Sequence, residues 1–360
     1  MSNCCTRNNK TVRMAILNDQ SKSIKEKISF LISVLAKLVG LDGFIIDLIS
    51  MIVLAWLWPA GGEKRSPLHL AAIANYGVSA IFFFYGLRLD IESLKSGISK
   101  WRLHLVVHLT TFILFPLLVL LFQAFFKTNS NATLWLGVFF LASLPSTVSS
   151  SVVMVSIARG NIPAAIFNAS ISSLLGVFIT PIWMGLVVHS NTGDYNLSAV
   201  IGKLILQVLV PVVLGILLHK KLGGFAGRYR KRLRYFDQTI ILLIVYTSFC
   251  ESFAKKMFSG FSLTTLFIVA SGMIALFLLV YNIVKIVCRL LNFNREDSIT
   301  AVFCGSKKSL VHGTVMSKVL FSGSDIVGVV LLPLMIYHAL QLIAASIIAQ
   351  SMAKEVDVQV

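Results

Sequence analysis

Ten apolar runs, most of them close to the length that spans a bilayer, constrain this chain more than any other feature. A helix needs ~20 mostly apolar residues to cross the hydrocarbon core. Hydrophobic residues make up 56% of the 360 residues, charged residues only 13%, and the mean hydropathy is +0.84. The sequence therefore predicts an all-α, polytopic integral membrane protein. The predicted spans are Leu41–Trp58, Leu68–Leu89, Leu103–Phe126, Leu134–Ile157, Ile162–Val188, Ala199–Leu218, Thr239–Phe253, Leu263–Leu291, Ile299–Phe321 and Ile326–Met352.

The fourth and ninth predicted spans each contain a polar run at mid-length. These runs are Leu144–Ser151, which includes Pro145, and Cys304–Ser309, which includes two lysines. Inside a bilayer, an interrupted helix leaves backbone groups that lipid cannot satisfy, so it is stable only where protein or a wet cavity covers it. A matching pair of interruptions, one in each half of a chain, indicates the binding site of a secondary transporter.

The formal net charge is +17, and the basic residues cluster in alternate loops. Seven of the 32 Lys and Arg residues lie in the N-terminal segment and seven lie between Lys220 and Arg234. Because cytoplasmic loops are rich in Lys and Arg, we expect both termini in the cytoplasm of a multi-pass cell membrane protein. The Lys220–Arg234 loop lies midway, so five spans on each side predict an inverted repeat. The predicted parts are a cytoplasmic N-terminal segment (1–40), two five-helix repeats (41–190 and 191–352) and a cytoplasmic tail (353–360).

The first 40 residues contain no A-x-A-like cleavage site after an early apolar run, so we expect no signal peptide. Between Ser23 and Val39, apolar residues recur at helical spacing among lysines. This pattern predicts a basic amphipathic helix on the inner membrane surface. The alternative is a disordered N-terminal segment whose positive charge only sets the orientation of the protein in the membrane, because the helical pattern is short.

Several other classes of function lack their motifs. No P-loop indicates ATP as the energy source, and no nucleophile or carboxylate pair indicates an enzyme. The basic residues lie mainly in the loops predicted to be cytoplasmic, as in membrane proteins, which argues against nucleic acid as a partner. The five cysteines form no disulfide framework, so we expect free thiols. His104 and His108 have the i, i+4 spacing of metal ligands, but two imidazoles without a third ligand make a weak site, and hydrogen bonds to neighbouring helices explain them better. We expect no bound cofactor.

The fourth and fifth spans carry a cluster of polar side chains around one proline. Hydroxyl and carbonyl oxygens at an unwound helix suit a small cation, and N–H groups at a half-helix N-terminus suit an anionic group. The alternative is that these small residues only let helices pack closely, with hydroxyls bonded to their own backbone. For the cluster as a whole, the proline favours a binding function. The candidates are Pro145, Ser146, Thr147, Ser149, Ser150, Ser151, Asn168, Ser170 and Ser172.

Two adjacent lysines lie near the middle of the ninth span, where each costs ~2.5 to 3.5 kcal/mol in a lipid environment. Such a lysine can hold an anionic substrate, replace a bound metal cation or carry a proton. The tenth span adds a histidine, which is either a proton relay or a hydrogen-bonding partner of a neighbouring helix. The candidates in this half are Cys304, Ser306, Lys307, Lys308, Ser309, His338 and Gln341.

From Asp42 to the tenth span the chain resembles the bile acid:sodium symporter family, in the branch with the eukaryotic seven-type cotransporter and bacterial relatives. The resemblance implies two inverted five-helix repeats, a panel domain and a core domain, with broken fourth and ninth helices that cross at the midplane. It also implies a sodium site near Ser150, Ser151 and the Ala165–Ala169 segment. The strings that carry it are Tyr76–Val78, Phe82–Leu87, Leu144–Thr147, Arg159–Asn161, Thr180–Trp183, Gln207–Pro211, Phe303–Leu310 and Leu332–His338 with Gln341.

The sequence departs from that family in the ninth helix. The bile acid carriers have an acidic residue and a glutamine there, and alignment on Phe303 places Cys304 and Lys308 at those positions. An ammonium group in place of these groups repels a sodium ion at ~4 Å by several kcal/mol in a partly buried site. Two conventional sodium sites are therefore not expected.

Three functions are consistent with the sequence. The first, which we favour, is a secondary active transporter that moves a small organic anion by alternating access, with a lysine in the role of a cation and with protons or one sodium ion as the coupling ion. The second is a membrane regulator of calcium or ion homeostasis, which the resemblance to eukaryotic members of this branch implies. The third is a cation/proton antiporter on a related ten-helix scaffold. The lipid bilayer is the expected partner, and the sequence gives no oligomeric state.

Overall fold

A computed structural model describes residues 43–63, 66–88, 100–126, 131–192, 202, 205–258, 261–321 and 324–357. The chain divides into two compact units, Met1–Ile46 and Asp47–Val360. The predicted amphipathic helix of the N-terminal segment lies outside the described residues. The arrangement below concerns the second unit.

Every regular element in the described ranges is a helix, which confirms the predicted all-α class for that part of the chain. Two short π-helical turns are present in the described residues: η3 lies between α5 and α6, and η5 directly precedes α12. The elements are α2 (Gly43–Leu57), η1 (Pro59–Gly61), α3 (Leu70–Leu87), α5 (Trp101–Leu109), η3 (Thr110–Leu114), α6 (Phe115–Leu121), α7 (Gln123–Phe126), α8 (Ala132–Ser143), α9 (Ser149–Ile157), α10 (Ile162–Thr192), η5 (Ile205–Leu209), α12 (Val210–Arg228), α13 (Arg230–Ala254), α14 (Leu263–Leu290), α15 (Arg295–Gly305), α16 (Leu310–Leu320) and α17 (Val327–Asp357).

The predicted apolar runs coincide with these helices. In the described residues, six helical stretches are long and apolar enough to cross a membrane, and Ile46–Leu57 and Ala132–Ser143 are shorter apolar helices. The fourth and ninth runs are each broken at the predicted place, because α8 is separated from α9 and α15 from α16. Two helices extend beyond their predicted runs, since α13 starts at Arg230 and not near Thr239, and α12 ends at Arg228 and not at Leu218. The six long stretches are Leu70–Leu87, Trp101–Leu121, Ile162–Val187, Ile205–Arg228, Leu263–Leu290 and Val327–Ala353.

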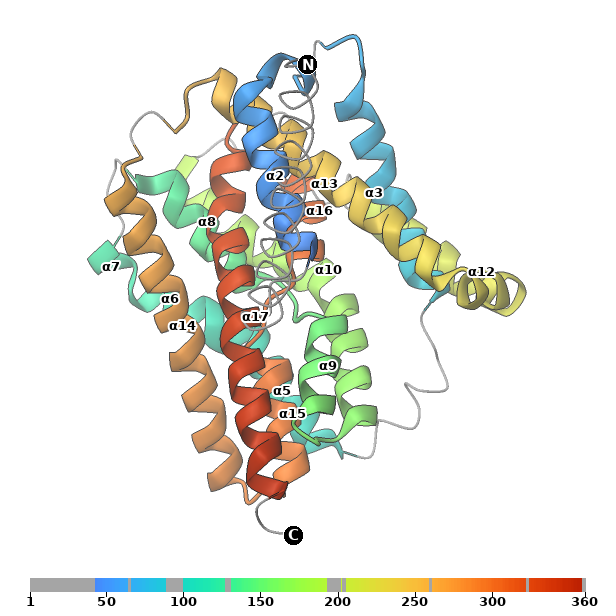
Figure 1. Cartoon of the computed structure of the whole chain (residues 1–360), viewed down its shortest axis with the longest axis vertical. Coiled ribbons are helices and arrows are strands. Elements are labelled where there is room, and N and C mark those ends of the chain that lie inside the picture. The colour runs from blue at the N-terminus through green and yellow to red at the C-terminus, as the bar shows by residue number, and fades with distance from the viewer. Residues whose placement is uncertain are drawn as a thin grey trace, which may run out of the picture. The chain divides into compact units, whose positions relative to one another are not determined.

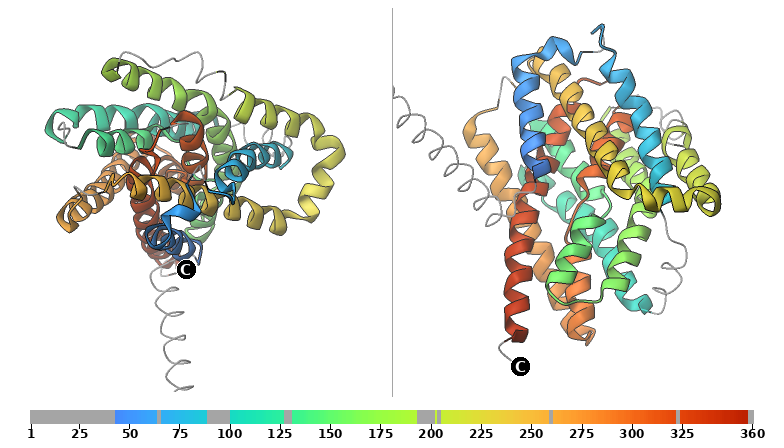
Figure 2. Two further views of the ribbon diagram at one scale, coloured as in Figure 1. Left: turned by 90° about the horizontal axis from the view of Figure 1, so that it is seen from above. Right: turned by 45° about the vertical axis from the view of Figure 1, so that its right-hand side comes forward.

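Helix α3 packs closely against α12, with α13 beside it (Figures 1 and 2). The contact uses two glycines, since a Cβ atom on Gly86 would meet the Val212 carbonyl and one on Gly215 would meet the Phe83 carbonyl. Small residues let helix backbones approach in this way. A larger side chain at either glycine would therefore separate the two helices.

The long helix α17 lies beside α14 (Figure 1) and also packs against α8. At Gly137 of α8, a Cβ atom would lie 2.7 Å from the Val330 carbonyl of α17. Because α8 ends only a few residues later, this close contact fixes the end of α8 next to the polar middle of α17. The two broken helices therefore meet beside an unbroken one.

Candidate functional site

The two helix breaks contact each other directly. The Ser309 N–H donates to the Pro145 carbonyl at 2.9 Å, and the Ser146 hydroxyl donates to the Cys304 carbonyl at 2.6 Å. The Ser151 hydroxyl adds a bond of 3.2 Å to the Phe303 carbonyl. Residues separated by more than 150 positions thus satisfy each other's backbone groups, as an interrupted membrane helix requires.

Helix α8 ends because Pro145 has no N–H group for the helical ladder. The next N–H, that of Ser146, leaves the ladder and donates to the Ser172 hydroxyl of α10 at 2.9 Å. The last carbonyls of α8 are therefore free to accept other donors. One of them, the Ser143 carbonyl, accepts from the Thr180 hydroxyl at 2.8 Å.

A second proline frees carbonyl groups between α5 and α6. In the π-helical turn η3 the Phe115 N–H bonds to the Thr110 carbonyl, five residues before it. The next residue in this pattern is Pro116, which has no N–H for the Thr111 carbonyl. Single π-helical turns of this kind are frequent at functional sites. The Phe112 carbonyl, which Pro116 also leaves without its α-helical donor, accepts from the Trp183 indole N–H at 2.8 Å.

Lys308 occupies the space that these freed carbonyls surround. Its Nζ donates to the carbonyls of Thr111 at 2.7 Å, Ala142 at 2.6 Å and Leu144 at 2.8 Å, and it lies 4.2 Å from the centre of the Phe115 ring. The side chain is 0% exposed. Two of the three acceptors lie at the C-terminal end of α8, where the helix dipole favours a positive charge. Lys308 thus acts as a cation built into the chain.

Gln341 of α17 holds the backbone of the same lysine. Its Oε1 accepts from the Lys308 N–H and its Nε2 donates to the Lys308 carbonyl, both at 2.8 Å. Nearby, the Tyr337 hydroxyl donates to the Ser306 carbonyl at 2.7 Å. The α15–α16 break is therefore tied to α17 by neutral groups.

His338 also belongs to this network, through a 2.9 Å contact between its Nδ1 and the Nε2 of Gln341. The backbone groups of Lys308 fix the orientation of the Gln341 amide, so Nε2 is the donor in this contact. The Nδ1 of His338 is then an acceptor and carries no proton. This places the imidazole in its neutral form with the hydrogen on Nε2.

Lys307, the neighbour of Lys308, has a different environment. Its side chain is also 0% exposed, but its Nζ has no hydrogen-bond partner among the residues that the structure describes. The Cys304 thiol and the His338 ring lie within its electrostatic range. The two adjacent lysines are therefore not equivalent.

The predicted hydroxyl cluster lies at the break, but many of its hydroxyls already have partners. The Ser150 hydroxyl donates to Thr147 at 2.8 Å, and Thr147 and Ser151 share a bond of 2.7 Å. The Ser306 hydroxyl bonds to its own helix at the Val302 carbonyl. Ser309 caps α16, where its hydroxyl accepts from the His312 N–H at 3.3 Å. The position of Ser149 is described, but its side chain is not.

Two predicted residues on α10 form hydrogen bonds to residues outside the two helix breaks. The Asn168 side chain donates to the Ala164 carbonyl at 2.9 Å and pairs with the His104 ring at 3.1 Å. The Ser170 carbonyl accepts from the Tyr85 hydroxyl at 3.0 Å. His104 thus has a hydrogen-bond partner on a neighbouring helix, as expected. For His108 the prediction was wrong, because neither of its ring nitrogens has a hydrogen-bond partner among the described residues. In the described part of the chain no group of three His, Cys, Asp or Glu side chains is arranged for a metal ion.

The sequence did not predict the residues that surround Lys308. They contribute backbone carbonyls and an aromatic face, so the side-chain types of Thr111, Ala142 and Leu144 carry no signal. Pro116 is the one sequence feature that indicates free carbonyls in this part of the third run. Its position on the same side of the fold as Lys308 comes only from the structure.

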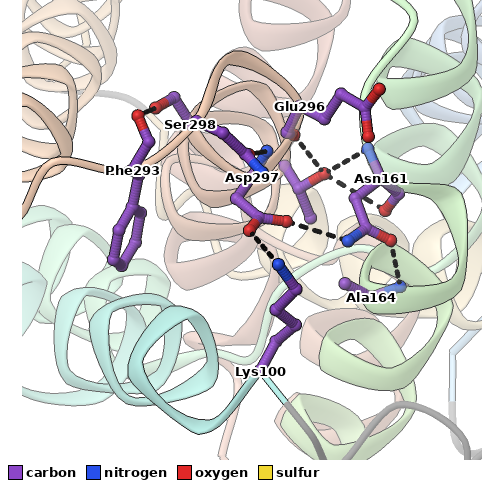
Figure 3. Close-up of polar contacts among 9 residues, drawn as sticks. Lys100, Asn161, Ala164, Phe293, Glu296, Asp297 and Ser298 are labelled. Carbon is purple, nitrogen blue, oxygen red and sulfur yellow. Dashed lines mark hydrogen bonds and ion pairs between the residues drawn. The ribbon is translucent and has the colours of Figure 1, made fainter.

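A second polar cluster lies at the ends of α10 and α15 (Figure 3). The Asn161 side chain donates to Asp297 at 2.8 Å and caps α10 by accepting from the Ala164 N–H at 3.1 Å. The Lys100 ammonium bonds to the other Asp297 oxygen at 2.9 Å. This hydrogen bond raises the pKa of Lys100 above its ordinary value. The cluster links the start of α5 to both α10 and α15.

Comparisons with known proteins agree on one family. The model of the SBF-like CPA transporter family matches residues 42–354. The protein PA2026 of Pseudomonas aeruginosa is 39% identical over 316 residues, which cover 88% of this chain and 94% of the relative. YfeH of Escherichia coli K12, named as a candidate symporter, is 37% identical over 319 residues, with 88% and 94% covered. Sodium/bile acid cotransporter 7-B of Xenopus laevis is 32% identical over 312 residues, with 85% and 90% covered.

The match to the family model covers most of the chain, and the relatives align over nearly their full length. These similarities, together with the apolar helices, point to an integral, multi-pass membrane protein whose relatives are transporters and not enzymes. The protein belongs to the SBF-like CPA transporter family.

Proposed function

We propose that this protein is a secondary active transporter that moves a small organic anion by alternating access, with Lys308 in the place of a bound coupling cation. The observation that carries the proposal is the position of the Lys308 ammonium, which is fully buried among three backbone carbonyls. Carbonyls freed at discontinuous helices bind the coupling ion in many transporters. A covalently attached ammonium at such a site removes the need for one free ion.

The proposed scaffold has ten membrane spans in two inverted five-helix repeats, with both termini in the cytoplasm of a plasma or inner membrane. The ion pairs support this topology, because each joins residues that the charge pattern places on the same side. Arg88 pairs with Asp237 at 2.7 Å and Lys100 with Asp297 at 2.9 Å, on the predicted cytoplasmic side. Lys255 pairs with Asp325 at 3.3 Å on the predicted outer side.

The proposed substrate is an organic anion of the type named for the relatives, which include sodium/bile acid cotransporters. Two buried lysines lie at the crossing, Lys307 and Lys308. Because an amine can become positively charged but not negatively charged, they favour an anion over a cation as the transported species. With one cation site filled by Lys308, the coupling ion is a proton or a single remaining sodium ion. The proposed ligands of that sodium ion include the hydroxyls of Thr147, Ser150 and Ser151, because the Thr147 oxygen lies 2.8 Å from that of Ser150 and 2.7 Å from that of Ser151.

Uptake into proteoliposomes tests the proposal. The full-length protein is reconstituted, and uptake of radiolabelled taurocholate and a panel of small carboxylates is measured in sodium or potassium buffer with an imposed pH gradient. We expect anion uptake that persists without sodium and that is reduced at least tenfold in Lys308→Met, when uptake is expressed per amount of folded, reconstituted protein. Uptake that requires two sodium ions and is unchanged in this variant would refute the role of Lys308.

A paired variant makes the test sharper. Cys304→Glu combined with Lys308→Gln introduces the acidic residue and the glutamine that the resemblance to bile acid carriers implies for a sodium site. If Lys308 replaces a cation, this double variant becomes dependent on sodium, whereas Cys304→Glu alone does not. Sodium flux driven by a pH gradient with no organic anion would instead indicate a cation/proton antiporter. Flux of no ion or anion, with altered calcium entry in cells, would indicate a regulator.

A further inference from the structure

Lys307 presents a buried amine with no function in the packing described above. Its side chain is 0% exposed, and no described residue accepts a hydrogen bond from its Nζ. Lys308, one residue later, has three acceptors. Burying an ammonium ion without an acceptor carries a large desolvation penalty, whereas a neutral amine avoids most of it.

The groups that face Lys307 do not supply a negative charge. They are the Cys304 thiol from α15 and the His338 imidazole from α17. His338 accepts at Nδ1 from Gln341, so it is neutral in this network. Other titratable or charged groups on elements near the break are His104 and His108 on α5, Glu251 on α13, Tyr281 and Cys288 on α14, Lys308 in the break, His312 on α16 and Tyr337 on α17.

None of these groups is ion-paired with Lys307 in the described structure. Tyr337 uses its hydroxyl on the Ser306 carbonyl, and the Nδ1 of His312 contacts the Ser309 hydroxyl at 3.0 Å. The Lys308 ammonium is itself fixed among carbonyls. Among the residues that the structure describes, a charged Lys307 therefore has no counterion.

We propose that Lys307 carries the coupled proton, as a neutral amine in the conformation described and as an ammonium ion when an anionic carboxylate or sulfonate group lies beside it. This inference rests on the proposed function and assigns the coupling step to one residue. The amine lone pair takes one proton from water as the anion enters, and no bond of the substrate forms or breaks. Proton and monovalent anion then cross and leave together, so the step moves no net charge.

The proposal gives the adjacent residues Lys307 and Lys308 different roles. Lys308 stays protonated because its carbonyl acceptors are part of the fold, and Lys307 changes its protonation because its only counterion is the substrate. A lysine is suited to this role, since burial shifts its proton affinity readily, whereas an arginine remains charged.

The test is a direct titration of Lys307 that does not depend on knowing the substrate. The full-length protein, with lysine labelled with carbon-13 at Cε, is placed in phosphatidylcholine nanodiscs, and its NMR spectrum is recorded across the pH range. Lys307→Arg identifies the Lys307 signal by its loss, and Lys307→Gln serves if that variant does not fold. Lys256→Arg identifies the signal of an exposed lysine as the control.

We expect the Lys307 signal at the neutral-amine position at about pH 8, where an exposed lysine is still an ammonium ion. A Lys307 signal at the ammonium position at about pH 8, like that of Lys256, would overturn the proposal. A second measurement adds potassium taurocholate in weak buffer, where bound anion should take up about one proton per protein. Binding without proton uptake would also overturn it. If the Lys307 signal titrates as expected but taurocholate does not bind, the result counts against the proposed substrate and not against Lys307 as the titrating group.

Discussion

The two helix breaks meet at one point, but they satisfy their free backbone groups in different ways. At the end of α8, the Ala142 and Leu144 carbonyls accept from a charged lysine. At the end of α15 and in its break, the carbonyls accept from neutral hydroxyl and amide groups, those of Ser146, Tyr337 and Gln341. The difference shows that an interrupted helix does not by itself define an ion site. The donor that tertiary contacts bring to its carbonyls decides whether the site is charged.

The largest effect is expected from removing the charge at the α8 end. Lys308→Met keeps much of the side-chain volume but leaves three buried carbonyls without their donor. Loss of one partner of a buried, charged interaction typically costs ~3–5 kcal/mol, so this variant should lose most of its folded population in detergent. The measurement is the thermal unfolding temperature, followed by size-exclusion chromatography with fluorescence detection.

The matched control for this variant is Lys307→Met, which removes a lysine with no acceptor and should leave the unfolding temperature unchanged or raised. Equal destabilisation by the two substitutions would show that burial, and not the carbonyl acceptors, determines the contribution of each lysine.

An intermediate effect is expected on the neutral side of the comparison. Gln341→Leu leaves the N–H and the carbonyl of Lys308 unpaired, at ~1–3 kcal/mol for each buried group. Gln341→Glu keeps the acceptor for the N–H but loses the donors to the Lys308 carbonyl and to His338. We therefore expect Gln341→Leu to lower the unfolding temperature and Gln341→Glu to restore part of that loss at most.

Hydrogen exchange at the Lys308 amide is the site-specific measurement for this prediction, and it should be faster in Gln341→Leu than in the wild type. Unchanged protection of that amide would contradict the role of Gln341 as the clamp of the break.

The smallest effect is expected at the polar cluster outside the crossing. Asp297 raises the pKa of Lys100 by its hydrogen bond and charge, so the pair stabilises the folded state fully below the ordinary pKa of about 10.4. That contribution is lost as the pH rises through the raised value. Lys100 is largely accessible to water, and exposed pairs contribute little.

A comparison of unfolding temperatures from neutral to alkaline pH checks this prediction. The difference between the wild type and Lys100→Met should be small at neutral pH and should disappear at high pH, while Lys100→Arg should keep it. A difference that grows with pH would have the wrong sign for a raised pKa.

Prediction from the sequence was most successful where the type of one residue has a direct structural effect, as with proline, which lacks an N–H, or lysine, which carries an amine. Pro145 predicts the end of α8, and the structure ends that helix at Ser143. Lys307 and Lys308 predict a polar centre, and both are fully buried at the break. The roles of the two lysines were not separable in advance, because adjacent positions in a break point in different directions that only the fold defines.

Other predicted site residues form hydrogen bonds that the sequence did not indicate. Asn168 stays a predicted ligand, and its side chain bonds to Ala164 and His104, which the sequence did not indicate. His338 was predicted to be a proton relay or a hydrogen-bonding partner; its Nδ1 contacts the Gln341 amide at 2.9 Å, and its role as a relay stays a prediction. A hydrogen-bonding side chain has several possible partners, and sequence spacing does not rank partners that come from other helices.

Three features could be predicted from the amino-acid sequence alone: the apolar, helical character of the described part of the chain, the places where two helices break, and the two lysines in the second break. These features follow from local physics, because side-chain polarity sets which segments enter a bilayer and proline lacks the N–H that a helix needs. The packing of the helices, by contrast, encloses Lys308 with carbonyls from the third and fourth predicted spans and leaves Lys307 without an acceptor among the described residues. Backbone carbonyls are the same in every residue, so their convergence on one ammonium depends on how the helices pack and has no signature in the sequence.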